Sequence, residues 1–180
     1  TCCNGTAIES STKLQNSIYF KSVDNKALYV NLFVPSTLTW KEQDVVITQE
    51  TSFPREDHTK LTVNGKGKFE LNLRIPGWAT AGVALKINGE TQQLAIEAGS
   101  YLSLDRKWKD GDTIELKMPF TFHLDPIMDQ ENIASLFYGP VLLAAQEDAP
   151  RTDFRKITLN AEDLGKTITG DPKALEFTID

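Results

Sequence analysis

The sequence predicts an all-β fold, a two-sheet antiparallel β-sandwich of the jelly-roll type with one short helix at the N-terminus. About ten short segments alternate apolar and polar residues or run apolar for a few residues, which is typical of strands. Turn-forming pairs such as Pro76-Gly77 and Asn88-Gly89 separate these segments. Because only one segment looks helical, a parallel sheet with crossover helices is not expected.

The elements follow in chain order. Residues 4–16 predict a short helix with a thin apolar face at Ile8 and Leu14, and residues 17–34 predict a hairpin. The clearest strand is 68–75, where every second residue from Phe69 to Ile75 is apolar. Further strands are predicted at 45–51, 83–87, 91–94, 101–104, 113–118, 120–124, 133–138 and 175–179, with an apolar segment at 141–145.

Composition narrows the class of function. The chain has 180 residues, a formal net charge of −6, 40% hydrophobic and 24% charged residues, as expected of an ordinary globular protein. No long basic run is present, so we expect no nucleic-acid partner. The longest apolar runs, such as residues 140–145, are too short to cross a bilayer, so we expect no membrane partner.

The two cysteines, Cys2 and Cys3, are adjacent and lie at the start of the chain. A disulfide ring between neighbouring cysteines is strained. A structural zinc site generally needs four ligands, and His58 and His123 are remote in sequence. Two interpretations stay open: the cysteines are ordinary thiols, or they belong to a site whose other members lie elsewhere.

Three tryptophans, Trp40, Trp78 and Trp108, occur in polar, turn-rich contexts. An exposed indole can stack on the C–H face of a sugar, which makes these residues candidates for substrate binding. The alternative is that each closes the end of the sandwich and donates its N–H to a backbone carbonyl. The carboxylates show no spacing that marks a catalytic pair, although glycosidases commonly use two.

Several ordered motifs resemble a known family. They are CCNGTAIESSTKLQNSIYF, LYVNLFVPSTLTW, VVITQETSFP, LNLRIPGWA, KINGE, YLSLDRKWKDGDTIELKMPF and ASLFYGPVLLAA. Together they resemble bacterial β-L-arabinofuranosidases of glycoside hydrolase family 127 and the related family 146. The resemblance covers residues 1 to 147 and is weaker beyond.

This resemblance implies a domain division and a chemistry. Residues 1–16 would be the remnant of the last helix of a catalytic (α/α)6 barrel, 17–147 a C-terminal β-sandwich, and 148–180 a linker with C-terminal strands that we expect to be truncated. In the family, a glutamate and three cysteines bind zinc, and a thiolate is the nucleophile. Cys2 would then be nucleophile and zinc ligand, and Cys3 a zinc ligand, in the full-length enzyme. The remaining ligands and the acid/base glutamate would precede Thr1.

We therefore predict a non-catalytic β-sandwich region of a bacterial glycoside hydrolase acting on arabinofuranosides, which supports the catalytic barrel. The alternatives are a carbohydrate-binding module or a purely structural scaffold. The predicted partners are the enzyme's own barrel and, in the whole enzyme, an arabinose-containing glycan. The chain alone is expected to be inactive and to bind no zinc, and its uncovered apolar surface favours self-association. The sequence leaves the compartment, periplasm or cytoplasm, open.

Overall fold

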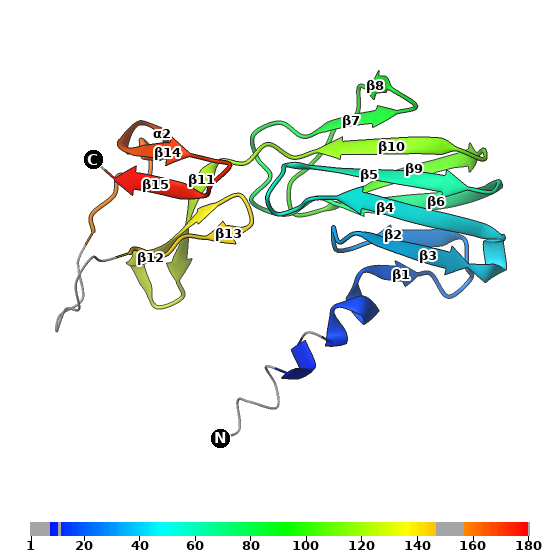
Figure 1. Ribbon diagram of the computed structural model, residues 1–180, viewed down its shortest axis with the longest axis horizontal. Coiled ribbons are helices and arrows are strands. Elements are labelled where there is room, and N and C mark those ends of the chain that lie inside the picture. The colour runs from blue at the N-terminus through cyan, green and yellow to red at the C-terminus, as the bar shows by residue number, and fades with distance from the viewer. Residues whose placement is uncertain (1–7, 11, 147–156, 180) are drawn as a thin grey trace. The chain divides into compact units, whose positions relative to one another are not determined.

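The computed structural model describes residues 8–10, 12–146 and 157–179 and consists mostly of β-strands (Figure 1). Contacts divide the chain into two compact units, Thr1–Met118 and Pro119–Asp180. The boundary predicted from the sequence lies at residue 147, whereas the strands between residues 119 and 146 belong to the second unit. Among the described residues, no helix is long and apolar enough to cross a membrane.

Residues 8–10 and 12–13 are helical, in agreement with the described part of the predicted N-terminal helix, and a 3-10 turn, η1 (Gln15–Ser17), follows. A second 3-10 turn, η2 (Lys41–Gln43), precedes β4. The first unit holds two sheets. The four-stranded sheet has the order β1 (Tyr19–Lys21), β2 (Ala27–Val30), β6 (Gly67–Arg74) and β9 (Tyr101–Trp108). The six-stranded sheet has the order β3 (Ser36–Trp40), β4 (Val45–Thr51), β5 (His58–Asn64), β10 (Asp112–Lys117), β7 (Ala84–Ile87) and β8 (Glu90–Gln92).

The two sheets of the first unit share one hydrophobic core. Alternation along each strand sends every second side chain inward, as Phe69, Leu71 and Leu73 show in β6. Both sheets contribute to a single cluster, which includes Leu28, Val30, Ile47, Leu61, Val63, Leu71, Leu73, Leu85, Leu104, Ile114 and Leu116. The core is therefore built from the inward side chains of both sheets, while the alternate side chains of each strand lie outside it.

The hairpins predicted at residues 17–34 and at Asn88-Gly89 are present as β1–β2 and β7–β8, and one pairing differs in direction from the prediction. The hairpin β7–β8 turns at Asn88 and Gly89, whose φ angles of 53° and 80° are those of the expected tight turn. The prediction of a wholly antiparallel arrangement is wrong for β2 and β6, which run parallel with Tyr29 opposite Asn72. Three strands, β3, β4 and β5, separate β2 from β6 in sequence, which gives the chain room to return in the same direction.

The second unit contains two small sheets. One has the order β11 (Phe122–Ile127), β12 (Gln130–Tyr138) and β13 (Val141–Leu142), and the other pairs β14 (Ile168–Asp171) with β15 (Glu176–Ile179). The single-turn helix α2 (Leu164–Thr167) precedes β14. Phe122, Tyr138 and Phe177 join the two sheets, with ring centroids 4.9 to 5.1 Å apart.

Candidate functional site

The cysteine pair predicted as nucleophile and zinc ligand, Cys2 and Cys3, lies outside the described residues. Within the described ranges, no group of three or more His, Cys, Asp and Glu side chains could hold a metal ion. The roles of Cys2 and Cys3 therefore stay predictions.

Two of the three candidate tryptophans are core residues. Trp108 is completely buried, stacks on Phe69 with a centroid distance of 5.9 Å, and donates its indole N–H to the Phe69 carbonyl at 3.0 Å. Trp40 is 3% exposed and meets the same phenyl ring edge-on at 5.2 Å. A buried indole offers no face to a sugar, so these positions favour the interpretation in which the tryptophans close the sandwich.

Trp78 is the tryptophan with the most accessible position. It is half-buried, packs against the edge of the core, and stacks on Phe53 with centroids 6.2 Å apart and planes 22° apart. Phe53 in turn meets buried Phe33 edge-on at 5.7 Å. Through these ring contacts, the loops that follow β4 and β6 pack against the core.

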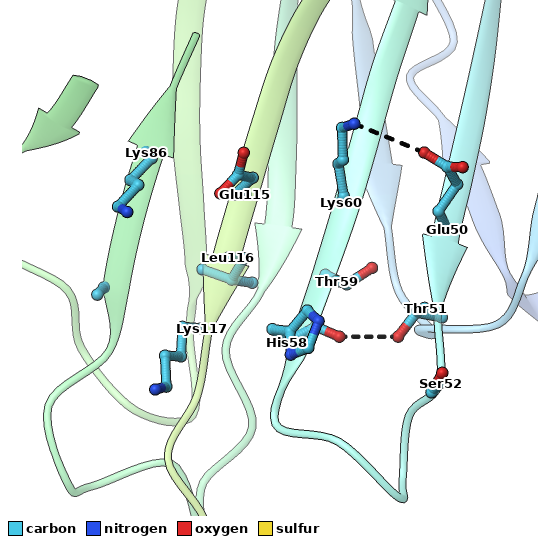
Figure 2. A pocket seen from close by; sticks show the side chains of 11 residues that line it. Glu50, Thr51, Ser52, His58, Thr59, Lys60, Lys86, Glu115, Leu116 and Lys117 are labelled. Carbon is cyan, nitrogen blue, oxygen red and sulfur yellow. Dashed lines mark hydrogen bonds and ion pairs between the residues drawn. The ribbon is translucent and has the colours of Figure 1, made fainter. Parts of the chain in front are cut away.

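A groove lies on the outer face of the six-stranded sheet of the first unit (Figure 2). Its volume is about 570 Å³. Strands β4, β5, β10 and β7 form its floor, with the residues Glu50, Thr51, Ser52, His58, Thr59, Lys60, Ala84, Lys86, Glu115, Leu116 and Lys117. The sequence analysis did not single out this groove, because it depends on the register of four strands.

The floor of the groove is a row of alternating charges. In cross-strand register, Glu50 lies opposite Lys60, Lys60 opposite Glu115, and Glu115 opposite Lys86. The Lys60 ammonium is 3.8 Å from the Glu50 carboxylate, as Figure 2 shows. Opposite charges directly across strands stabilise a sheet modestly. Because they balance one another, the row does not select an anionic or a cationic ligand.

At one rim of the groove, His58 lies between two carboxylates. Its Nε2 is 3.5 Å from Glu56 and its Nδ1 is 3.7 Å from Asp57, while Lys117 is 3.8 Å from Asp57. The imidazole is more than half exposed, and exposed ion pairs are strongly screened by water. These pairs therefore contribute little to the stability of the fold.

One carboxylate of the turn at Asp110-Gly111-Asp112, between β9 and β10, is structural. Asp112 is 6% exposed and accepts hydrogen bonds from Asn88 Nδ2 at 2.9 Å and the Lys109 backbone N–H at 2.8 Å. Burial raises the pKa of Asp112, but these hydrogen bonds and the nearby Arg106 and Lys109 charges outweigh it, so the pKa lies below its ordinary value. The Asp112 side chain therefore links the turn at Asn88 to the turn at Lys109.

Comparison with known proteins identifies the family to which this chain belongs. Residues 27–120, which include the strands from β2 to β10, match the family model of the GH127 β-L-arabinofuranosidase middle domain. The chain belongs to the GH127 family. The family predicted from the sequence is thus confirmed, with one correction: the β region is the middle domain of the family, whereas the prediction placed it at the C-terminus.

Relatives of the GH127 chain are much longer. The non-reducing end β-L-arabinofuranosidase of Bifidobacterium longum subsp. longum is 22% identical over 158 residues, which cover 81% of this chain and 23% of the relative. A solved glycoside hydrolase is 29% identical with a TM-score of 0.67, over 78% of this chain and 24% of its own. A GH127 β-L-arabinofuranosidase from Geobacillus stearothermophilus T6 is 30% identical with a TM-score of 0.61, over 72% and 21%. The chain therefore spans about a quarter of the length of these relatives.

Proposed function

We propose that this chain is the non-catalytic middle β region of a larger enzyme that hydrolyses arabinofuranosides, and that it supports the catalytic domain of that enzyme. The match of residues 27–120 to the GH127 middle domain carries the proposal. The shared core of the two sheets supports it, because a rigid, well-packed domain suits a supporting role. We further propose that the two sheets form a sandwich of the jelly-roll type.

Exposed apolar side chains support contact with another part of the enzyme. On the N-terminal helical segment, Ile8 and Leu14 are 73% and 54% exposed. An isolated helix this short is marginal in water, so a packing partner would stabilise it. In the second unit, Ile133 and Leu142 are 47% and 58% exposed. Surfaces of this kind are commonly covered by a partner.

For the whole enzyme, we propose that residues 1–16 close the catalytic barrel, with Cys2 as nucleophile and zinc ligand and Cys3 as zinc ligand. Two thiolates are suitable donors for zinc, and a closed or catalytic zinc site needs further ligands, so the fit requires residues beyond this chain. Bound zinc would keep these thiols deprotonated near neutral pH. Cys2 would supply a thiolate to the anomeric carbon, and Cys3 would help to orient it.

The test compares this chain with the whole enzyme. Arabinose release from a synthetic β-L-arabinofuranoside is measured for the 180-residue chain, for the whole enzyme, and for Cys2→Ser and Lys68→Ala variants of the whole enzyme. We expect activity only in the wild-type enzyme and the Lys68→Ala control, since Lys68 is exposed on the β region. Arabinose release by the chain alone, or full activity of the Cys2→Ser enzyme, would contradict the proposal.

A further inference from the structure

A second hollow lies along the free edge of the four-stranded sheet. It has a volume of about 400 Å³ and is formed between the outer edge of β9 and the extended segment before it, with the residues Leu94, Ala95, Ile96, Glu97, Ser100, Tyr101, Leu102 and Ser103. Tyr101 and Ser103 also face the outer surface of the sheet, because Leu102 and Leu104 take the core positions of β9. The hollow therefore opens onto the outer sheet face.

Tyr101 presents an aromatic ring that is held in place and still accessible. It is 43% exposed. Its hydroxyl donates to Asn31 Oδ1 at 2.8 Å, and its ring meets Tyr29 edge-on with centroids 5.4 Å apart. Because both its ring and its hydroxyl are held by neighbouring residues, this side chain loses little conformational entropy when a ligand binds. Residues that recognise ligands well share this property.

Polar groups surround this ring on the same face. Ser103 donates to Glu70 Oε1 at 2.6 Å from the neighbouring strand. Asn72 lies in register between Tyr29 and Ser103, is only 4% exposed, and its Nδ2 has no hydrogen-bond partner among the described residues. A buried amide without a partner is unusual, and it lies beneath the polar outer surface of this part of the sheet.

The chemistry of these groups selects one class of ligand. Aromatic rings beside hydroxyl and amide groups complement a sugar, whose C–H face is apolar and whose rim carries hydroxyls. The carboxylates of Glu70 and Glu97 at the same place disfavour an anionic ligand. We propose that Tyr101, with the hollow beside β9, is a binding site for a neutral oligosaccharide, separate from the supporting role proposed above.

This site does not depend on the tryptophans, of which Trp40 and Trp108 are buried. It needs no bond-breaking chemistry, and it does not depend on whether the region supports a catalytic domain. An oligosaccharide would stack one ring on Tyr101 and extend its next unit toward Ser100 and Glu97 in the hollow.

The experiment is a titration of the isotope-labelled 180-residue chain with linear arabinopentaose, xylopentaose and cellopentaose, followed by amide chemical shifts. Titration to about 10 mM detects dissociation constants in the millimolar range. We expect at least one of the three sugars to shift the amides of Tyr101, Ser103 and their neighbours in the hollow. The absence of shifts with all three sugars, or shifts confined to other surfaces, would overturn the proposal.

Variants locate the interaction. Tyr101→Ala removes the ring, and we expect affinity to fall about tenfold or more, as for other central aromatic contacts. Tyr101→Phe keeps the ring and should bind within about threefold of the wild type. Lys107→Ala, at an exposed position on the same strand, is the matched control and should bind normally. Unchanged affinity of Tyr101→Ala refutes the site; if that variant does not fold, the shift map of the wild-type chain decides.

Discussion

Replacing Trp108 by alanine should destabilise the first unit strongly, because this residue is a core residue and not a ligand platform. An indole buries roughly 150–250 Å², and at about 25 cal/mol per Å² this corresponds to about 4–6 kcal/mol. Trp108 is fully buried, stacks on Phe69, lies under the Arg106 guanidinium at 5.0 Å, and fills its one hydrogen bond. Because alanine retains part of the burial, we expect a loss of about 3–5 kcal/mol.

The assay is urea unfolding followed by tryptophan fluorescence. All three tryptophans lie in the first unit, so after the substitution Trp40 and Trp78 still report on that unit alone. With a urea m-value of about 2 kcal/mol/M, a loss of about 4 kcal/mol moves the midpoint by about 2 M. Trp108→Phe keeps an aromatic ring but loses the indole N–H, and should lose about 1–3 kcal/mol.

The result that would refute the reasoning is a Trp108→Ala midpoint within about 0.5 M of the wild type, which corresponds to about 1 kcal/mol. Such a chain would not depend on the indole for its stability. The burial and the Phe69 hydrogen bond would then have no energetic consequence, and a role for Trp108 outside the core would need to be considered again.

Three smaller predictions concern single side chains. The lowered pKa of Asp112 means that its charged form stabilises the fold at pH values above the ordinary carboxyl pKa of 3.8, and that this stabilisation is lost as the pH falls through the lowered folded pKa. Asp112→Asn should therefore lose about 1.5–3 kcal/mol at pH 7 and less near pH 3 in urea titrations, and a constant difference would argue against a charge effect. Gly65→Ala should lose about 1–3 kcal/mol by thermal unfolding, because φ is +108° and a Cβ would lie 2.8 Å from the Asp44 carbonyl, whereas Gly77→Ala has open space and serves as the control. Lys60→Ala should change stability by less than about 1 kcal/mol because its ion pair is exposed, and a loss above 2 kcal/mol would show that the charge row matters more than exposed pairs generally do.

Strands with a clear apolar alternation were predictable, and those without it were not. The segment 68–75 has four apolar residues on one face and corresponds closely to β6. Strand β5 (His58–Asn64) was not singled out, because its inward positions are Thr59, Leu61 and Val63 while its outward positions are polar. A threonine at one of its three core positions weakens the apolar signal of this short strand, and pairing with β4 and β10 reveals its place.

Non-local pairing explains the other differences. The parallel contact of β2 with β6 joins segments about forty residues apart, and no local pattern in either strand distinguishes a parallel from an antiparallel neighbour. The charge row from Glu50 to Lys86 likewise needs the register of four strands. Sequence periodicity gives the face on which a residue lies, while the identity of its neighbour across the sheet comes from the fold.

Two aromatic residues of β9, Tyr101 and Trp108, show what the two-residue period of a strand predicts about burial. Trp108 follows polar residues and precedes a turn, a context that favours exposure, yet it has the same parity as Leu102 and Leu104 and so faces the core. Tyr101 has the opposite parity and faces outward, where Tyr29 of β2 and Asn31, which follows β2, hold it. The local composition around Trp108 left both interpretations open, a sugar-binding platform or a core residue. The two-residue period of the strand separates the two residues: Trp108 lies on the core face and Tyr101 on the outer face. A buried indole cannot contact a sugar, whereas an exposed tyrosine ring can. The carbohydrate-binding hypothesis for β9 therefore concerns Tyr101 and not Trp108.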